Sequence, residues 1–357
     1  MEPIRARLSA QVQVPGLAGL ALGYGAFRWP EGICLVMARE DQHVSLYDLR
    51  GPVDGAGPVA RIAATVPAGR VAAPSPDGSY VVVCDQQELR AVDADGTVRW
   101  RLEHPCWGCA DTIDHGSEPP CGGIDGGSAY VSSDSALVWA HVVAPWDEDA
   151  ETGERLLVLD AATGTIVGSA GLGVGTAGSG LLLHPDGHQA VLSIGYGQDG
   201  AVCYLARWDG AQLTLTEFED MDRIAVDIDP GGRLVLTTPH SGADLALYQM
   251  SDLACTVRLA AADVAHDQGV TTGWDYVAGF VDGGTIVAVL DTHGADDVST
   301  HWLLDCERGP IGPVAYPAGA ASGMTGLVGL GDGAWATIDA AGLLCLWRLG
   351  SVGSSRR

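Results

Sequence analysis

Short hydrophobic segments alternate with turn-forming residues along the whole chain. The turns share a Pro-Asp-Gly character and occur at Pro30-Glu31-Gly32, Pro76-Asp77-Gly78, Ser133-Asp134-Ser135, Pro185-Asp186-Gly187, Pro230-Gly231-Gly232, Asp282-Gly283-Gly284 and Asp332-Gly333. Proline presets φ at the first turn position, aspartate bonds its own backbone, and glycine tolerates a positive φ, so each instance predicts a tight turn between two strands. The turns recur at intervals of about 50 residues, which predicts a sevenfold repeat.

A second landmark follows each turn within the same unit. A strand ends there on an aromatic or aliphatic residue that is usually followed by aspartate: Leu46-Tyr47-Asp48, Ala91-Val92-Asp93, Val158-Leu159-Asp160, Arg207-Trp208-Asp209 and Leu303-Leu304-Asp305. The other two units end this strand at Leu247-Tyr248 and Leu346-Trp347, without the aspartate. Each unit therefore predicts four short antiparallel strands, named a to d in chain order, and a period of roughly 40–50 residues is typical of a propeller blade.

The N-terminus holds one strand that the repeats do not use. Its apolar positions alternate with polar or charged ones, as in a strand with one polar face: Ala6, Leu8, Ala10, Val12 and Val14. The residues after Trp347 are too polar to form a fourth strand in the seventh unit, so we expect Arg5–Val14 to complete it and remove two sheet edges. The predicted organisation is a single domain: residues 1–14 close the last blade, 15–349 form seven repeats, and 350–357 are a disordered tail. Six or eight blades are the alternatives.

The repeats resemble the WD-repeat β-propeller family, in a degenerate form, over nearly the full length of the chain. The Ser75-Pro76-Asp77-Gly78 turn, the Trp208-Asp209 dipeptide and an aspartate between strands b and c carry the resemblance; this aspartate is Asp41, Asp85 or Asp339. The Gly-His dipeptide that the family places before strand a is absent from most units. The resemblance implies an all-β, seven-bladed propeller of four-stranded antiparallel blades, with a binding or scaffold function toward a protein or peptide.

Composition narrows the functional classes. Acidic residues outnumber basic ones, 45 to 19, and the net charge of −26 disfavours nucleic-acid binding. The chain contains neither Lys nor Asn, which excludes Schiff-base chemistry and N-glycosylation sites, and its Ala, Gly, Arg and Asp bias suggests a bacterial gene. No signal peptide or long apolar segment is evident, so we expect a cytoplasmic protein without a membrane span. Two G-x-G-x-x-G matches, at Gly173–Gly178 and Gly195–Gly200, lead into β-type segments, so no nucleotide cofactor is expected.

Long connections are expected on one face of the propeller. The turns between strands a and b and between c and d are short, whereas these segments are long: His104–Gly127, Ala144–Glu154, Gly195–Ala201, Thr238–Asp244, Ala261–Tyr276 and Asp291–Thr300. Loops that extend from one face of a rigid framework commonly carry function. We therefore expect binding or catalysis at this face.

The most distinctive chemistry lies in the first of these connections. Its His-Pro-Cys-Trp-Gly-Cys segment contains a C-x2-C pair and is followed by a further histidine and cysteine, which together form a candidate zinc or other transition-metal site: Cys106, Cys109, His115 and Cys121. Unligated thiols or a redox dithiol are the alternatives, because the spacing fits no standard zinc module. Histidines in the long connections form a weaker candidate set that a smaller metal site can recruit: His104, His240, His266 and His293.

Aromatic and acidic residues border the same predicted face. The candidate binding residues are Trp107, Trp146, Asp147, Tyr196, Asp199, Trp274, Asp275 and Asp296. One hypothesis is a non-enzymatic propeller that binds a protein or peptide there. The other is a metal-dependent propeller enzyme that acts on a small molecule or peptide through the Cys/His connection above the central channel. The sequence identifies no catalytic residue, and it leaves the choice between these hypotheses open.

Overall fold

The computed structural model describes residues 3–14, 26–29, 34–40, 42–49, 57–66, 72–105, 107, 127–143, 153–173, 178–195, 200–264, 271–293, 298–317, 324–339 and 342–349. Within these ranges every element is a β-strand except one 3-10 turn, η3 (Ala261–Asp263), as the hydrophobic pattern predicts. No helix formed by the described residues is long and apolar enough to cross a membrane.

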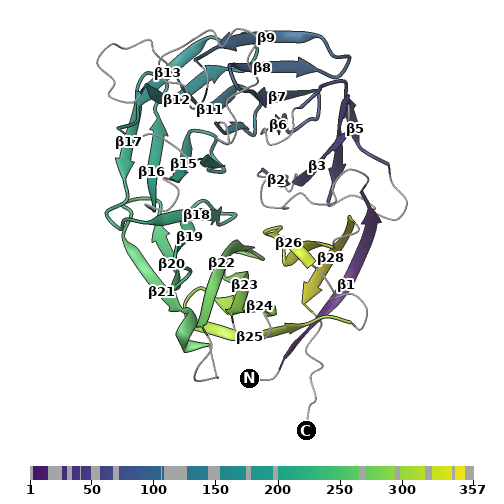
Figure 1. Ribbon diagram of the computed structural model, residues 1–357, viewed down its shortest axis with the longest axis vertical. Helices are drawn as coiled ribbons and strands as arrows, with labels where there is room; N and C mark the ends of the chain where they lie inside the picture. Colours follow the sequence, from purple (N-terminus) through teal and green to yellow (C-terminus); the bar gives the residue numbers. More distant parts are fainter. Residues whose placement is uncertain are drawn as a thin grey trace. The chain divides into compact units, whose positions relative to one another are not determined.

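The chain divides into two compact units. The four-blade unit comprises residues 27–48 and 57–225, and the three-blade unit comprises residues 1–26, 49–56 and 226–357. In both units the described strands pair in groups of four, in the order a-b-c-d that the repeats predict, and each group is one blade. Figure 1 labels these strands and shows β6 to β9 following one another toward the periphery of their unit.

The four-blade unit contains the first four repeats. Its strands are β2 (Ala26–Arg28), β3 (Cys34–Glu40), β4 (His43–Asp48) and β5 (Ala60–Ile62) in the first blade; β6 (Ala72–Pro74), β7 (Tyr80–Cys84), β8 (Glu88–Asp93) and β9 (Val98–Glu103) in the second; β10 (Ala129–Val131), β11 (Leu137–Val143), β12 (Glu154–Asp160) and β13 (Ile166–Gly171) in the third; and β14 (Gly178–Leu183), β15 (Gln189–Gly195), β16 (Ala201–Trp208) and β17 (Leu213–Glu217) in the fourth.

The three-blade unit contains the last three repeats and the N-terminal strand. Its strands are β18 (Arg223–Ile228), β19 (Leu234–Pro239), β20 (Asp244–Gln249) and β21 (Cys255–Ala260) in the fifth blade; β22 (Thr271–Phe280), β23 (Thr285–His293), β24 (Val298–Asp305) and β25 (Gly309–Ala315) in the sixth; and β26 (Met324–Gly329), β27 (Ala334–Asp339), β28 (Leu343–Leu349) and β1 (Ile4–Gln13) in the seventh.

The turns between strands a and b have the chemistry that their sequence predicts. Between β6 and β7, Ser75 donates from its hydroxyl to Asp77 Oδ1 at 2.7 Å, and the same oxygen accepts from the Ser79 amide at 3.0 Å. Gly78 has a backbone φ of 67°, a conformation that residues with a side chain rarely adopt. The third blade repeats the pattern, with the Ser132 hydroxyl donating to Asp134 Oδ1 at 2.6 Å. These short-range bonds close one end of each blade without a long loop.

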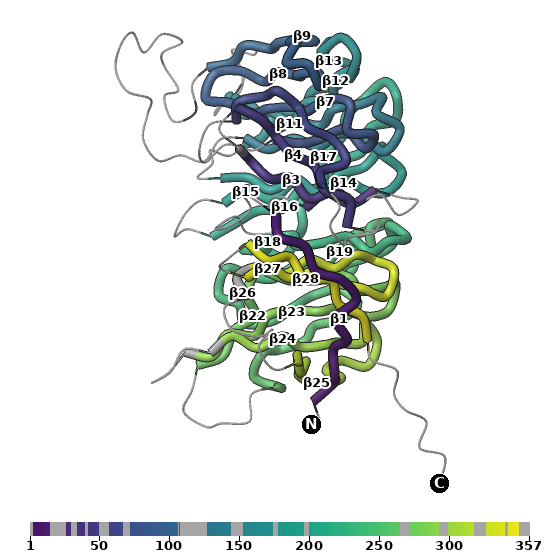
Figure 2. The backbone as a smooth tube through the Cα atoms, turned by 90° about the vertical axis from the view of Figure 1, so that its right-hand side faces the viewer, coloured from purple at the N-terminus to yellow at the C-terminus, as the bar shows by residue number. Residues whose placement is uncertain are grey.

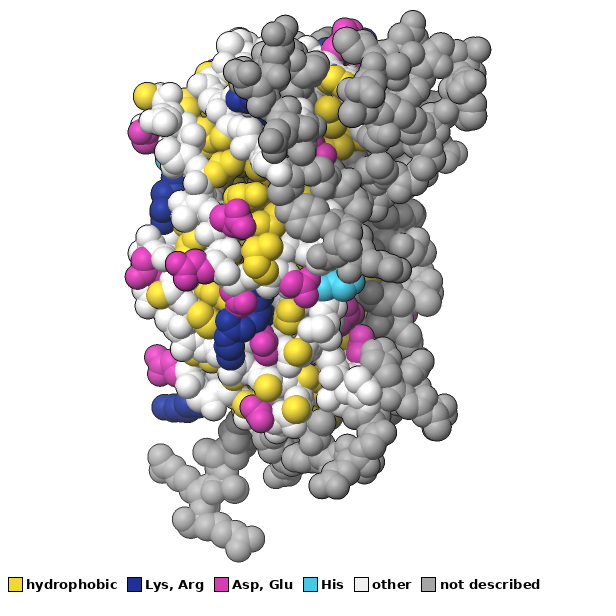
Figure 3. Space-filling model, turned by 60° about the vertical axis from the view of Figure 1, so that its left-hand side comes forward, with side chains coloured by type: hydrophobic (Ala, Val, Ile, Leu, Met, Phe, Trp, Pro, Cys, Tyr) yellow, Lys and Arg dark blue, Asp and Glu magenta, His cyan; other side chains and the backbone are white. Residues whose placement is uncertain are grey.

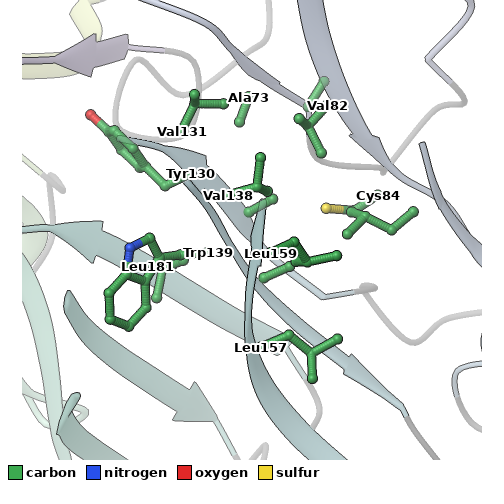
Figure 4. Packing of buried hydrophobic residues seen from close by; sticks show 14 of the residues in the cluster. Ala73, Val82, Cys84, Tyr130, Val131, Val138, Trp139, Leu157, Leu159 and Leu181 are labelled. Carbon is green, nitrogen blue, oxygen red and sulfur yellow. The ribbon is translucent and has the colours of Figure 1, made fainter. Parts of the chain in front are cut away.

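Hydrophobic side chains fill the space between neighbouring blades of the four-blade unit. Strand β11 is buried on both faces, so successive residues pack against different blades. Figure 4 shows Trp139 beside Leu181 of the fourth blade, while Val138 projects toward the side where Val82 and Cys84 of the second blade lie. The Trp139 indole also donates to the Gly187 carbonyl at 3.0 Å, which connects the third blade to the turn of the fourth.

An aromatic cluster links the innermost strands of the first and third blades. The Trp29 indole donates to the Val131 carbonyl at 2.7 Å, and the Tyr130 hydroxyl donates to the Arg28 carbonyl at 3.0 Å. The rings of Phe27, Trp29 and Tyr130 are all buried and lie within 6.0 Å of one another, centroid to centroid. Apolar rings therefore occupy the interior of this unit next to β2 and β10.

The N-terminal strand completes the seventh blade, as predicted. Residues 6–13 of β1 pair antiparallel with β28, from Ala6 opposite Leu349 to Gln13 opposite Leu343. The start of β1 also pairs in parallel with β25, at Ile4 opposite Val314, so the sixth and seventh blades share one eight-stranded sheet. Figure 2 shows β1 lying along β28 and reaching β25. The two ends of the chain are thus held in one sheet.

Polar bonds between aromatic side chains cross from the sixth to the seventh blade. The Trp335 indole on β27 donates to the Tyr316 hydroxyl at 3.0 Å, and this hydroxyl lies 2.6 Å from Nδ1 of His301 on β24. Burial lowers the pKa of His301 to about 4, so the imidazole is neutral at physiological pH. On β28 the Trp347 indole donates to the Thr337 hydroxyl at 2.8 Å. Both indoles, both hydroxyls and Nδ1 of His301 therefore have partners.

Two connections are shorter than the sequence predicts. The expected loop Ala261–Tyr276 ends earlier, because β22 begins at Thr271, and the expected loop Asp291–Thr300 shrinks because β23 and β24 extend into it. The backbone ladder continues there, pairing Thr271 with His293 and Thr292 with Val298. The ends of these strands are polar, so their sequence pattern resembles that of a loop. The boundary between strand and loop is set instead by backbone pairing.

Candidate functional site

Strand register places the long connections at the same end of each blade. In the third blade the start of β10 lies opposite the end of β11, at Ala129 and Ala140, and the end of β11 pairs with the start of β12, at Val143 and Glu154. The fourth blade has the same arrangement, because Gly195 pairs with both Gly178 and Ala201. We call this end, where strand a begins and strands b and c are joined, the b–c end. Blade by blade, the longer connections leave from it.

The connection from the second to the third blade begins with anchored residues at the b–c end. After β9, the His104 amide donates to the Gln87 carbonyl at 2.9 Å and the Trp107 amide donates to the Gln86 carbonyl at 3.2 Å. The Gln86 side-chain amide donates back to the Trp107 carbonyl at 2.6 Å. The tight turn between β7 and β8 therefore fixes the position of Trp107.

Trp107 is packed into the third blade. It is among the largest fully buried side chains, at 1% exposure, and its ring lies 5.1 Å from the His141 ring in an edge-to-face arrangement. Gly127 closes the contact from the other side: a Cβ there would lie 1.8 Å from the His141 carbonyl oxygen and 2.7 Å from Cζ2 of Trp107. Only glycine lets the chain pass this close to both residues.

His141 and Glu154 form a buried pair across strands β11 and β12. His141 Nε2 lies 3.2 Å from Glu154 Oε2, and the side chains are 0% and 8% exposed. The two atoms are not aligned for a hydrogen bond, and neither ring nitrogen of His141 has a hydrogen-bond partner among the residues that the structure describes. Burying polar groups without such bonds costs free energy, so the pair lowers stability unless another interaction compensates.

His104 lies on the other side of Trp107. Its ring centroid is 6.2 Å from that of Trp107, and its Nδ1 lies 2.7 Å from the Pro105 carbonyl oxygen, a contact that makes Nδ1 the protonated nitrogen. Burial lowers the pKa of His104, which favours the neutral imidazole. The structure thus brings His104, Trp107, His141 and Glu154 together, and we call these four residues the His141 cluster.

The predicted zinc ligands are not tested by this geometry. Cys106, Cys109, His115 and Cys121 lie outside the described residues, as do His266, Trp146, Asp147, Tyr196, Asp199 and Asp296. For His293 the structure describes the backbone, which pairs with Thr271. Across the described ranges, no three His, Cys, Asp or Glu side chains are grouped so that they would hold a metal ion. The four-ligand site stays a prediction.

The remaining candidates lie in the fifth and sixth blades. His240 is exposed, and its Nδ1 and carbonyl oxygen lie 3.0 and 2.7 Å from the Tyr276 hydroxyl. Asp275 is half-buried, and burial raises its pKa with a further contribution from nearby Asp291. Trp274 is buried, at 2% exposure, and its indole donates to the Leu259 carbonyl at 2.9 Å. Asp275 and Tyr276 are therefore the groups accessible here, while Trp274 packs inward.

Sequence reasoning did not predict that Glu154 faces His141, nor that Gln86 bonds to the backbone of Trp107. The available signal was a histidine in the apolar segment Leu137–Val143 and a glutamate at the first position of the facing strand. Register between the two strands, which the sequence does not show, brings them together.

No protein-family model matches the sequence. No curated protein matches it either. Among solved structures, the β-propeller domain of Cps50 (Swd1) from Myceliophteria thermophila is similar, with a TM-score of 0.57 and 11% identity; the match covers 97% of this chain and 100% of that one. The fold is a β-propeller. BamB from Moraxella catarrhalis also matches, over 97% of this chain and 98% of that one, with 14% identity and a TM-score of 0.47.

Proposed function

We propose that this propeller is a binding or scaffold protein that holds a protein or peptide partner at the b–c end of its blades. The observation that carries the proposal is the contrast between the two ends of each blade. Ser–Asp and Asp–Gly turns close one end with short-range bonds, as at Ser75 and Ser132. The other end carries the longer connections, including residues 144–153 between β11 and β12 and residues 196–200 between β15 and β16. Rigid strands that present variable loops are a common basis for recognition.

The negative surface charge favours a partner whose binding surface is basic or neutral. The chain carries a net charge of −26. On the face drawn in Figure 3, acidic side chains are spread among hydrophobic and neutral atoms, and arginine side chains occur in small separate groups. Such a surface accelerates association with a basic partner and repels an acidic one. Binding should therefore weaken as the salt concentration rises.

The test compares the two ends of the same blades. Trp146→Ser combined with Tyr196→Ser alters the b–c ends of the third and fourth blades, while Val167→Ser combined with Gln212→Ser alters exposed positions elsewhere on those blades. Proteins cross-linked to each purified chain in an extract of its own cells would be identified by mass spectrometry. We expect the first pair to lose a partner that the second pair keeps. Equal capture by both double variants would overturn the proposal.

A metal-dependent enzyme is the second candidate function. The observation in its favour is the His141 cluster, whose Trp107 lies between Cys106 and Cys109 in the sequence. A bound transition metal would supply Lewis-acid chemistry toward a small molecule or peptide. The test is turnover of a peptide or ester library by the metal-loaded chain. Activity that depends on the metal and disappears in Cys109→Ser would favour this candidate over the scaffold.

A further inference from the structure

The innermost strand of the sixth blade, β22, is interrupted in its first half (Figure 1). Its pairing with β23 is regular up to Trp274 and resumes at Ala278, and the three residues between them face a single residue of β23. Irregularities of this kind redirect side chains and are common next to functional sites. The accessible side chains here are the half-buried Asp275 and the exposed Tyr276.

The Tyr276 ring is exposed but held in place. Its exposure is 37%, and its hydroxyl donates to the His240 carbonyl at 2.7 Å and lies 3.0 Å from Nδ1 of the same residue. The turn that carries His240 is itself fixed to β22, because the Gly242 carbonyl accepts from the Trp274 amide at 2.7 Å. An aromatic face that is already ordered loses little entropy when a partner covers it, and such rings are frequent anchors at interfaces.

The Asp275 carboxylate precedes this ring in the chain, and no ion pair to it is formed by the described residues. Its Oδ1 accepts from the Tyr276 amide at 2.6 Å. The second carboxylate nearby, Asp291, accepts from the Ser299 hydroxyl at 2.6 Å. Burial raises the pKa of Asp275, and the charge of Asp291 raises it further. A cation placed at Asp275 would offset both the desolvation and the repulsion between the two carboxylates.

The connections at the b–c ends of the fifth and sixth blades supply no such cation. Residues 238–244, 261–276 and 291–300 contain seven aspartates and no arginine, and the whole chain contains no lysine. Charge complementarity across an interface speeds association and selects the partner. These connections are therefore complementary to a basic segment of a partner, and the fixed ring of Tyr276 adds an aromatic face for its cation.

We propose that Asp275 and Tyr276 form a subsite for an arginine side chain of a peptide partner, with the guanidinium bonded to the carboxylate and stacked on the ring. Arginine fits this pair better than lysine, because a planar guanidinium stacks on an aromatic face and donates several hydrogen bonds in a fixed geometry, whereas the lysine ammonium is a strongly hydrated point charge. The inference rests on the proposed function, since it assigns one side chain of the peptide to the b–c end of the sixth blade.

The experiment measures peptide affinity of the full-length chain by fluorescence anisotropy. The probe is a fluorescein-labelled peptide of Arg-Gly repeats, compared with Lys-Gly and Gln-Gly peptides of the same length. We expect Asp275→Asn to weaken binding of the Arg-Gly peptide about fivefold or more, because a hydrogen bond to a charged group is lost. Tyr276→Leu should weaken it about threefold, whereas Tyr276→Phe keeps the ring and should bind like the native chain. The Lys-Gly peptide should bind more weakly, and the Gln-Gly peptide should not bind.

Asp252→Asn is the matched control. It removes the same charge from an exposed turn at the opposite end of the fifth blade, so it should bind the Arg-Gly peptide like the native chain. Far-ultraviolet circular dichroism and thermal melting check that each variant is folded. Equal affinities of Asp275→Asn and Asp252→Asn would overturn the subsite. So would equal losses in Tyr276→Phe and Tyr276→Leu, equal affinity of the native chain for Arg-Gly and Lys-Gly peptides, or no binding of the Arg-Gly peptide at all.

Failure of the subsite is distinguishable from failure of the proposed function. An Arg-Gly peptide that Trp146→Ser combined with Tyr196→Ser loses, but that Asp275→Asn keeps, would overturn the subsite alone and leave binding at the b–c end intact. Equal partner capture by the two double variants in the cross-linking test would instead overturn the proposed function.

Discussion

The third and seventh blades solve the same packing problem with different chemistry. The third is one continuous segment of chain, and its buried His141 and Glu154 have facing atoms that lie 3.2 Å apart without a hydrogen bond. The seventh is assembled from both ends of the chain, and its buried indoles are hydrogen-bonded: Trp347 donates to Thr337, and Trp335 donates to the Tyr316 hydroxyl of the sixth blade, which faces His301. The difference is between indoles whose hydrogen bonds support the fold and a buried histidine whose ring nitrogens have no hydrogen-bond partner among the described residues.

Assembly from two chain ends explains the bonding of the seventh blade. A blade formed by distant segments pays a loop-closure entropy that a continuous hairpin avoids. Directional indole and hydroxyl bonds, together with the pairing of β1 with two other strands, offset this cost and fix the register. The third blade is one continuous segment, so its pairing does not carry this closure cost.

Removal of the N-terminal strand should lower the stability of the seventh blade more than any other change proposed for these two blades. Without residues 1–14, β28 and β25 both lose a hydrogen-bonded neighbour, and the buried side chain of Ala6 and its contacts are lost. We expect a loss of about 5 kcal/mol or more in the free energy of unfolding, which is comparable to the stability of a typical domain. Thermal unfolding and size-exclusion chromatography should show early melting and aggregation.

Deletion of residues 350–357 is the control for this truncation. It shortens the chain without touching a described strand, so the melting temperature should stay the same. A chain lacking residues 1–14 that remains monomeric and melts like the full-length protein would show that the seventh blade does not depend on β1.

Gly127→Ala tests how much the close packing around His141 contributes to the stability of the third blade. The new Cβ would lie 1.8 Å from the His141 carbonyl oxygen, and backbone has to move to admit it. Overpacking of this kind lowers the free energy of unfolding by about 3 kcal/mol, which denaturant unfolding measures. Gly180→Ala in the same unit is the matched control, because no heavy atom lies within 4 Å of the added Cβ. Equal unfolding free energies for the two variants would contradict the close packing around His141.

The fold was predictable because its determinants are local. Turn residues such as Asp77 and Gly78 act within a few positions of the sequence, and alternating apolar residues define each strand without reference to distant partners. The unpaired alternation from Ala6 to Val14 was enough to predict where β1 would pair. Strand ends were less predictable, since Asp291 and Thr292 are polar and yet lie within the ladder of β23.

The site was predictable only in part, because its contacts are long-range. Cysteine spacing directed attention to the connection that begins at His104, and the structure does place His104 and Trp107 beside the third blade. Nothing in the sequence shows that Glu154 faces His141, since that depends on the register of β11 and β12. Burial of Trp107 and Trp274 was missed for a similar reason: an indole in a loop resembles a binding residue until its packing partners are known.

The pH dependence of stability should report on the contact between the sixth and seventh blades, where His301 of β24 faces the Tyr316 hydroxyl that Trp335 of β27 donates to. The folded pKa of His301 is lowered to about 4 from an ordinary value of 6.5, so between these values the unfolded chain binds one more proton. Stability is therefore complete above about pH 6.5 and falls as the pH decreases toward 4, by up to about 3 kcal/mol. Denaturant unfolding at several pH values measures this slope. His301→Gln should flatten the slope, whereas His240→Gln, at an exposed position, should preserve it; the same slope in both variants would assign the effect to other groups.

The smallest expected effect comes from a single hydroxyl in the seventh blade. Thr337→Val keeps the shape of the side chain but removes the acceptor of the Trp347 indole, which is 2.8 Å away and fully buried. A buried donor left without its partner costs about 1–2 kcal/mol, so the free energy of unfolding should fall by that amount without a change in the denaturant slope. Thr214→Val, at an exposed hydroxyl in the fourth blade, should change stability by less than about 0.5 kcal/mol. If Thr337→Val is also neutral, the indole bond does not stabilise the seventh blade, and completeness of bonding no longer distinguishes that blade from the third.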